Sequence, residues 1–178
     1  MTEAELVERA RRLFLDDEGF YGCAEVTLLT LWEALGLPGE ASSAAAMALN
    51  GGVAYRGEIC GALSGSAVAL GLWARSQETD HVTAKRRARV ATAALIDRFC
   101  GRFGSIRCRE LTGYDLGSAE KHDAFMASGV WKTACMRQIE FAVGQAVAIA
   151  EDRDPPQDPS RMPQPGPVRP GRACPSTD

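Results

Sequence analysis

Residues 1–151 carry the apolar spacing of α-helices along almost their whole length, and this pattern constrains the fold more than any other feature. The segment is rich in Ala, Leu, Glu and Arg, and its β-branched clusters are too few and too short to form a sheet. Glycine-containing breaks at 36–39 and 50–52 divide it. The sequence therefore predicts an all-α fold, a single compact domain of five to six or more helices over residues 1–151.

The individual helices are expected between glycines, prolines and capping residues. Thr2 and Glu5 stand at the spacing of a capping box, and Gly104 follows the longest periodic segment and should end it. Ser105 is placed to cap the next turn. The expected helices cover about 2–15, 23–35, 40–49, 59–74, 78–103, 106–111, 118–127 and 130–150.

A proline-rich tail follows the helical segment. Eight of the nine prolines lie from Pro155 onward, in a stretch with almost no apolar periodicity. Such a segment cannot bury enough apolar surface to offset the entropy that ordering costs. We therefore expect residues 152–178 to be a disordered Pro-rich tail, in which Cys174 is a mobile thiol without a role.

The bulk composition excludes several classes of protein. With a net charge of −3 and a pI of about 5.5, the chain lacks the broad basic surface that nucleic-acid binding needs. Residues 1–5 lack the basic-then-apolar order of a secretory signal, and no apolar run approaches the length that spans a bilayer, so we expect no membrane insertion and a cytoplasmic location. Six cysteines in a reducing compartment indicate metal ligation or redox chemistry more than a disulfide framework.

Cys60 has the most informative surroundings. It follows a glycine-bearing loop, and glycine lets the backbone adopt positive φ and approach another group closely. We place Cys60 in the first turn of a helix, where free N–H groups and the helix dipole would stabilise its thiolate, with Arg56 adding to the effect. Gly61 and Gly65, on one face with Ala62, leave room for a neighbouring helix or an inorganic cluster.

Three further cysteines lie in the helical segment. Cys23 also begins an expected helix after a glycine, and Cys108 follows the Ser105 cap between Arg107 and Arg109. Cys135 lies inside the last helix, where a buried structural thiol is the default expectation. Helix starts and arginines would reduce the free-energy cost of burying several thiolates together.

Spacing alone does not identify a metal. The separations of 37, 48 and 27 residues between the four cysteines match no compact zinc or ferredoxin signature. The absence of Cys-x-x-Cys argues against a thioredoxin-like dithiol, and the absence of Cys-x-x-Cys-His argues against covalent haem. His81 and His122, the only histidines, lie in polar stretches and are interpreted as solvated.

Three segments resemble a known family. Residues 57–65 (Gly-Glu-Ile-Cys-Gly-Ala-Leu-Ser-Gly), residues 69–72 (Ala-Leu-Gly-Leu) and residues 103–116 (Phe-Gly-Ser-Ile-Arg-Cys-Arg-Glu-Leu-Thr-Gly-Tyr-Asp-Leu) are similar to the bacterial redox-active proteins named for a C, GCAxxG, C, C pattern. The resemblance covers about residues 19–143. The chain departs from it with Val53, Ala54 and Tyr55 where members often continue a glycine run, with Cys100, and with the Pro-rich tail.

The resemblance implies a helical domain related to the non-haem domain of split-Soret cytochromes, and it implies a cofactor. In that family the four cysteines define the signature and are thought to hold a two-iron, two-sulfur type cluster. The implied metal ligands here are Cys23, Cys60, Cys108 and Cys135, and the residues expected to contact the cluster are Gly57, Gly61, Ala62, Gly65 and Arg107.

The sequence leaves three functions open. The first is an iron–sulfur protein for electron transfer or redox sensing, served by a redox partner protein. The second is a cluster-free thiol redox protein in which Cys60 is the reactive thiol, with a second cysteine resolving it. The third is a helical binding module, zinc-stabilised or dimeric, associated with a transporter or oxidoreductase. Cys100 is either a resolving thiol for Cys108 or a bystander, and enzymatic activity stays open.

Overall fold

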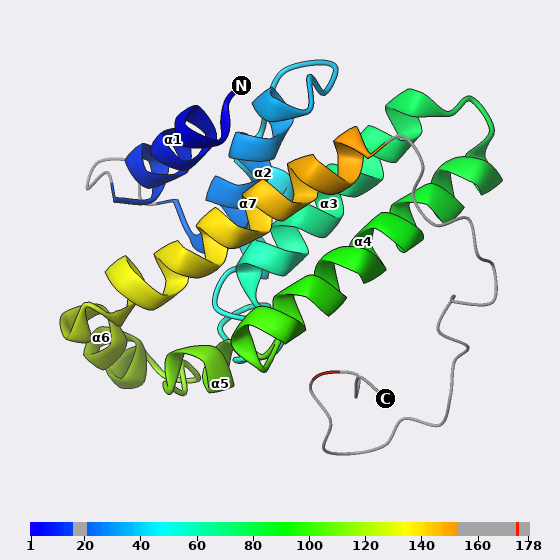
Figure 1. Cartoon of the computed structure of the whole chain (residues 1–178). Helices are drawn as coiled ribbons and strands as arrows, with labels where there is room; N and C mark the ends of the chain where they lie inside the picture. Colours follow the sequence, from blue (N-terminus) through cyan, green and yellow to red (C-terminus); the bar gives the residue numbers. More distant parts are fainter. Residues whose placement is uncertain (16–20, 153–173, 175–178) are drawn as a thin grey trace.

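The computed structural model describes residues 1–15, 21–152 and 174, and the described part is helical (Figure 1). Ile59 and Arg107 form an isolated β-bridge, but the described residues contain no strand, which confirms the all-α prediction. The elements in chain order are α1 (Glu3–Leu15), α2 (Cys23–Ala34), the 3₁₀ turns η1 (Ser43–Ala45) and η2 (Met47–Leu49), α3 (Gly61–Gln77), α4 (His81–Phe103), α5 (Cys108–Thr112), α6 (Ala119–Ser128), the π-helical turn η3 (Trp131–Cys135) and α7 (Met136–Glu151).

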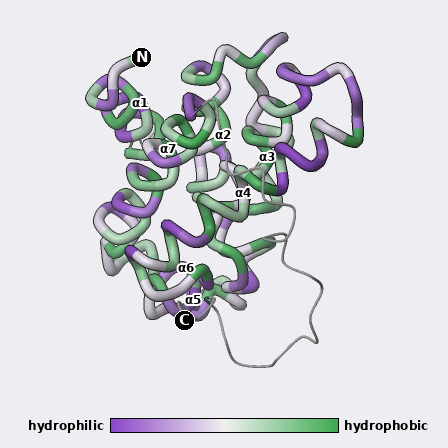
Figure 2. Tube along the Cα trace, turned by 45° about the vertical axis from the view of Figure 1, so that its right-hand side comes forward, coloured by the Kyte–Doolittle hydropathy of each residue, from purple (hydrophilic) through white to green (hydrophobic). Residues whose placement is uncertain are grey.

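Four helices enclose the main core. Helices α3 and α4 form a hairpin, α2 packs along α3, and α7 lies against all three, while α1 covers α2 and α7 (Figure 1). Hydrophobic residues concentrate along the facing parts of these helices (Figure 2). The largest fully buried side chains include Leu28, Leu31, Leu70, Leu95, Phe99 and Ile139. The short elements α5, α6 and η3 gather at one end, beside the start of α3.

Local capping explains most helix ends. Thr2 and Glu5 form the predicted capping box, since Thr2 N donates to Glu5 Oε2 at 2.7 Å and Glu5 N donates to Thr2 Oγ1 at 3.3 Å. The Asp80 carboxylate accepts from Thr83 N at the start of α4, and Gly104 ends that helix with a φ of 75°. Ser105 accepts from Arg107 N at 3.0 Å, just before α5.

One predicted helix is wrong. The segment expected to be helical over about 40–49 forms only the two turns η1 and η2. The Ser42 hydroxyl accepts a hydrogen bond from Ala44 N and starts η1, but the segment is short and consists largely of small residues. A helix of this length has little apolar face to pack, so connecting 3₁₀ turns replace it.

The proline-rich segment falls almost wholly outside the described residues, so the disorder expected of it stays a prediction. Asp152 and Cys174 are described, and Cys174 forms a disulfide with Cys100 of α4. The interpretations of Cys174 as a mobile thiol and of Cys100 as a bystander or resolving thiol are therefore wrong, because each is the other's partner. Within the described ranges, no helix combines the length and apolar character needed to cross a bilayer.

Candidate four-cysteine site

A short backbone pairing brings Cys60 and Cys108 together across 48 residues of chain. Cys60 N donates to Ile106 O at 2.8 Å, and Cys108 N donates to Glu58 O at 2.7 Å. These bonds flank the bridge between Ile59 and Arg107 and fix the start of α3 beside the start of α5. Cys60 is the N-cap of α3 and Cys108 is the first residue of α5, so the predicted placement of both at helix starts is confirmed.

Close packing of α2 on α3 brings Cys23 to the same place. Cys23 is the first residue of α2, and a Cβ atom added to Gly61 would lie only 2.2 Å from Cys23 Sγ. One turn further along α3, a Cβ on Gly65 would lie 2.3 Å from Ala24 O. The two glycines therefore let the helices approach until the Cys23 sulfur rests against the α3 backbone. The neighbour that fills the Gly65 face is a helix, α2.

Cys135 reaches the site from a different element. It ends the π-helical turn η3, directly before α7, and it packs with Cys108, Leu116 and Phe125 in a small apolar cluster. Single π-helical turns are rare and occur frequently at functional sites, because the extra residue redirects the side chains that follow. The sequence predicted Cys135 within a continuous helix and did not predict this turn.

The four thiols are close enough to influence one another electrostatically. Cys60 interacts with Cys23, Cys108 and Cys135, and Cys23 interacts also with Cys108 and Cys135. The side chains of Cys60, Cys108 and Cys135 are 3%, 5% and 8% exposed. Sulfur atoms from four remote segments thus form one group, buried except for the partly exposed Cys23, which we call the four-cysteine site.

Burial keeps these thiols protonated. Desolvation is the largest cause of a raised pKa at all four cysteines, and the neighbouring thiols raise the pKa further at Cys60, Cys108 and Cys135. The pKa of Cys108 rises to about 12, although Arg109 lowers it. The pKa of Cys60 rises well above its ordinary value. The prediction that the helix start stabilises a Cys60 thiolate is therefore wrong, because burial outweighs the backbone donors.

Backbone N–H groups nevertheless point at the sulfur atoms. Hydrogen bonds from the backbone of Gly51, Ala24 and Gly61 lower the pKa of Cys23, and one from Ala62 lowers that of Cys60. Converging N–H groups of this kind form a concavity that favours negative charge. The polypeptide therefore supplies donors that would support sulfur anions if their charge were compensated.

The loop next to Cys23, residues 51–55, is a left-handed turn. Residues 51–55 all have φ between 49° and 74°, including the non-glycine residues Val53, Ala54 and Tyr55. The turn is held by backbone bonds such as Gly57 N to Gly51 O and Glu58 N to Gly52 O, both 3.0 Å. A side chain in this conformation costs about 1–2 kcal/mol per residue, and such strain is found mainly at functional sites. We call residues 51–55 the left-handed turn.

Two buried polar groups at the site were not predicted. Gln138 of α7 is 4% exposed, and its Oε1 accepts from Cys60 Sγ at 3.5 Å. Asn50 is also buried, and it accepts from Ala24 N at 3.0 Å and donates to Glu25 Oε2 at 2.8 Å. Polar residues at core positions of a helical pattern are the signal that could have identified Gln138.

The structure gives other roles to some residues expected to contact a cluster. Gly57 (φ 73°) lies against Arg109, whose guanidinium binds Gly57 O, Arg56 O and Glu58. Arg107 pairs instead with Glu110, at 4.0 Å, and Arg109 is the arginine that acts on Cys108. Contact of Gly57, Gly61, Ala62, Gly65 and Arg107 with a bound group stays a prediction.

The sulfur atoms do not form a finished ion site. Across residues 1–15, 21–152 and 174, no group of three or more His, Cys, Asp or Glu side chains is arranged so that it could hold a metal ion. His81 begins α4, and His122 lies on α6 with its ring edge-on to Tyr55 at 5.0 Å. The four-cysteine site is thus a set of neighbouring neutral thiols.

Comparison with known proteins gives one match. A family model described as "Putative redox-active protein (C_GCAxxG_C_C)" matches residues 21–149, which contain all four cysteines of the site. No curated protein matches the chain. No solved structure matches it either.

Proposed function

Because the chain belongs to the C_GCAxxG_C_C family of redox-active proteins, we propose that it transfers or senses electrons through an iron–sulfur cluster of the two-iron, two-sulfur type. Its ligands would be Cys23, Cys60, Cys108 and Cys135. The observation that carries the proposal is the convergence of these four thiols, three of them buried, from four remote segments into one mutually interacting group. Four cysteine thiolates are the usual ligand set of such clusters.

The donor set fits this group. The side chains that converge are all sulfur donors, which favour iron–sulfur clusters over ions that bind carboxylates. Gly61 has no Cβ, so the Cys23 sulfur can lie against the backbone beside N–H donors. In a two-iron cluster, each iron binds two of the four thiolates, so the two pairs lie further apart than four thiolates around a single ion. This wider spacing suits the described thiols, which are neighbours but form no single-ion site.

Such a cluster, when bound, accepts and releases one electron at a time. The protein's own contribution is to exclude water, to orient the sulfur atoms and to donate hydrogen bonds to them from Gly51, Ala24, Gly61 and Ala62. Burial and hydrogen bonds to sulfur are the main means by which a protein sets a cluster's potential. Gln138 adds a polar group against Cys60 from α7.

The cluster-free alternative receives less support. A reactive thiol needs an accessible sulfur with a lowered pKa. Cys60 is buried, and its pKa is raised well above the ordinary value, so it lacks both properties. The disulfide of the described chain joins Cys100 to Cys174 and leaves the four site cysteines as free thiols.

The test is a metal and sulfide measurement on protein purified without exposure to air. The wild-type chain should be coloured and carry iron and acid-labile sulfide in equal amounts. Replacing any one site cysteine by serine should lower both, whereas Cys100→Ser, outside the site, should keep both. A colourless protein after attempted reconstitution, or equal losses in Cys100→Ser, would contradict the proposal.

A further inference from the structure

The left-handed turn adjoins Cys23, which its Gly51 backbone hydrogen-bonds, and the inference drawn from it rests on the proposed function. Three of the site cysteines are buried and Cys23 is partly exposed. Tyr55, at the end of the turn, is 44% exposed, yet burial and the neighbouring Cys23 and Glu25 raise its pKa. The Tyr55 ring also lies against Gly51, where an added Cβ would be 2.4 Å from Tyr55 Cδ1, and the Gly51 backbone hydrogen-bonds Cys23. Tyr55 is therefore both at the surface and next to the Cys23 end of the site.

The turn also exposes apolar surface. Val53 is 40% exposed beside Tyr55, and both are held there by a backbone conformation that disfavours residues with side chains. Exposed aromatic and aliphatic groups next to an arginine are typical of the centre of a protein interface. A strained backbone that holds apolar side chains in water has no benefit for the free protein. Covering by a partner would explain why Val53 and Tyr55 are held there.

A cavity of about 410 Å³ adjoins the turn. It lies between residues 54–56 and the start of α6, and its polar lining consists of Tyr55, Arg56, Ser118, His122 and Asp123. The Tyr55 and His122 rings meet edge-on at 5.0 Å and form one wall. A hollow of this size accepts one or two side chains of a docked protein.

One arginine that lines this cavity is unpaired within the described residues. Arg107 and Arg109 pair with Glu110 and Glu58, whereas the Arg56 guanidinium has no ion-pair or hydrogen-bond partner within the described part of the chain. Asp123 lies on the opposite wall, where its carboxylate is 4.0 Å from His122 Nδ1 and forms no ion pair with Arg56. A carboxylate from outside would therefore find an available cation at Arg56.

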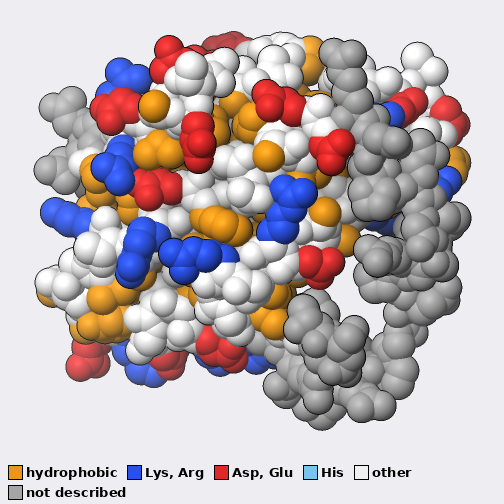
Figure 3. Space-filling view, viewed as in Figure 1, with side chains coloured by type: hydrophobic (Ala, Val, Ile, Leu, Met, Phe, Trp, Pro, Cys, Tyr) orange, Lys and Arg blue, Asp and Glu red, His pale blue; other side chains and the backbone are white. Residues whose placement is uncertain are grey.

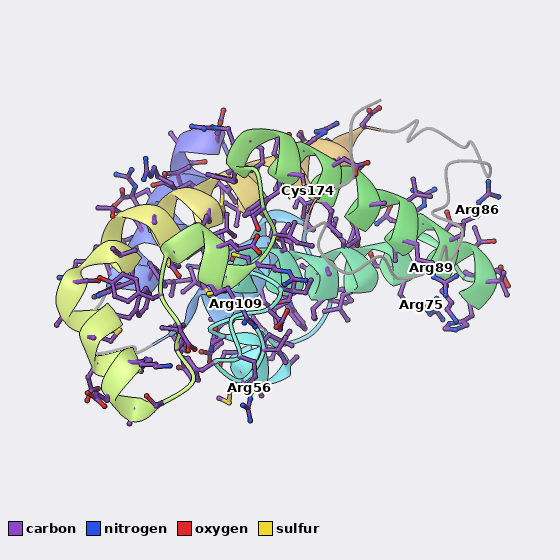
Figure 4. All side chains as sticks on the ribbon, turned by 90° about the horizontal axis from the view of Figure 1, so that it is seen from below. Arg56, Arg75, Arg86, Arg89, Arg109 and Cys174 are labelled. Atoms are coloured by element: carbon purple, nitrogen blue, oxygen red, sulfur yellow. A yellow bond between two sulfur atoms is a disulfide. The ribbon has the colours of Figure 1, made fainter. Side chains whose placement is uncertain are left out.

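A second basic region provides a comparison. Figure 4 shows Arg56 and Arg109 near the loop and α5, and Arg75, Arg86 and Arg89 far from them, where α3 and α4 meet. On the face seen in Figure 3, acidic and basic side chains are mixed and no single sign dominates. The Arg56 region combines positive charge with exposed apolar residues, a cavity and proximity to Cys23.

We propose that the surface formed by Val53, Tyr55, Arg56 and His122 is the docking site for an acidic redox protein. An acidic side chain of the partner binds Arg56 at the cavity, and its apolar neighbours cover Val53 and Tyr55. One electron would then pass from the reduced iron–sulfur cluster of the proposed function, held at the four-cysteine site, to the partner's acceptor; the cluster is oxidised by one electron, the acceptor is reduced by one electron, and no covalent bond forms or breaks. Because Arg56 is exposed in the free protein, its charge attracts the approaching partner and acts mainly on the rate of association.

The test uses two small oxidants of opposite charge in place of the partner. Reduced protein is mixed with ferricyanide, an anion, or with hexaammineruthenium(III), a cation, and oxidation is followed by absorbance. Each of the two oxidants accepts one electron per molecule. Arg56→Glu should slow oxidation by ferricyanide about 3- to 10-fold and speed oxidation by the cation, at an ionic strength of about 0.01 M. Arg56→Gln should give changes of the same sign and smaller size.

The matched control is Arg89→Glu, which makes the same charge change in the N-terminal half of α4, far from Arg56 (Figure 4). It should leave both rates close to wild type. Poly-L-glutamate, as an acidic macromolecule, should inhibit the ferricyanide reaction of the wild type and not that of Arg56→Glu. Equal effects of Arg56→Glu and Arg89→Glu, or a larger effect of Arg89→Glu, would overturn the docking site. Failure of wild-type protein to react with either oxidant would instead refute the proposed function.

Discussion

Replacement of Gly61 by alanine tests the packing that brings Cys23 into the site. An added Cβ would lie 2.2 Å from Cys23 Sγ and 3.0 Å from Ala24 N, whereas ordinary contacts begin at 3.4 Å. The sulfur must therefore retreat by roughly 1 Å, or α2 must move away from α3. Either change displaces one of the four thiols from the other three.

Opposing terms set the size of the effect. Overpacking a tight interior costs about 1–3 kcal/mol, and alanine regains up to about 1 kcal/mol through its higher helix propensity. We expect Gly61→Ala to lower the free energy of unfolding by about 1–2 kcal/mol, or Tm by about 2–4 °C for each kcal/mol. Gly71→Ala lies in the same helix and meets nothing within 4 Å, so it should raise stability by about 0.5–1 kcal/mol.

Two measurements separate the possible responses. Denaturant unfolding of the reduced, metal-free protein gives the stability change, and iron and sulfide analysis after anaerobic reconstitution reports the position of Cys23. If Cys23 rotates into another rotamer, the stability cost shrinks but the iron content still falls. The reasoning is refuted if Gly61→Ala and Gly71→Ala change stability in the same direction and retain the same iron content.

Three further outcomes are expected. Val53→Gly should raise the free energy of unfolding by about 1 kcal/mol, measured in denaturant, because it removes a β-branched side chain from a left-handed position. A loss of stability would contradict the strain assigned to Val53. The reduced, metal-free protein should lose stability as pH rises from 9 to about 12, because the unfolded chain releases the Cys108 proton before the folded chain does; the slope reaches about 1.4 kcal/mol per pH unit for each such thiol, and flat stability over this range would exclude the raised pKa. Gln138→Leu should lower the free energy of unfolding by about 1 kcal/mol, because the buried Cys60 thiol loses its acceptor. It should also shift the reduction potential of the cluster-loaded protein, and an unchanged potential would show that Gln138 does not act on the site.

The sequence predicted those features that depend on neighbouring residues. The capping box of Thr2 and Glu5, the left-handed end of α4 at Gly104 and the helix starts at Cys23 and Cys108 are set by short-range hydrogen bonds and backbone preferences. Each of these appears in the local pattern of residue types. For this reason, the order and approximate bounds of most helices were predictable.

The features that were missed depend on contacts between distant segments. The left-handed turn contains Val53 and Tyr55, which no local rule places at positive φ, and it is held by bonds within the folded loop. The disulfide of Cys100 joins positions 74 residues apart. Gln138 meets Cys60 only after α7 packs on α3. Spacing along the chain contains no information on these pairings.

The pKa of Cys60 shows why a local argument about the site gave the wrong sign. A helix start and backbone donors favour a thiolate by an amount that is modest and falls with distance, whereas complete burial opposes it by considerably more. The same burial acts differently on a thiolate bound to metal, since the metal's positive charge replaces the proton and compensates the sulfur's charge. A site that suppresses free thiolates at four neighbouring cysteines while aiming N–H donors at their sulfur atoms is therefore poorly suited to nucleophilic thiol chemistry. Under the proposed function, the thiols exchange their protons for metal, so metal affinity should rise with pH.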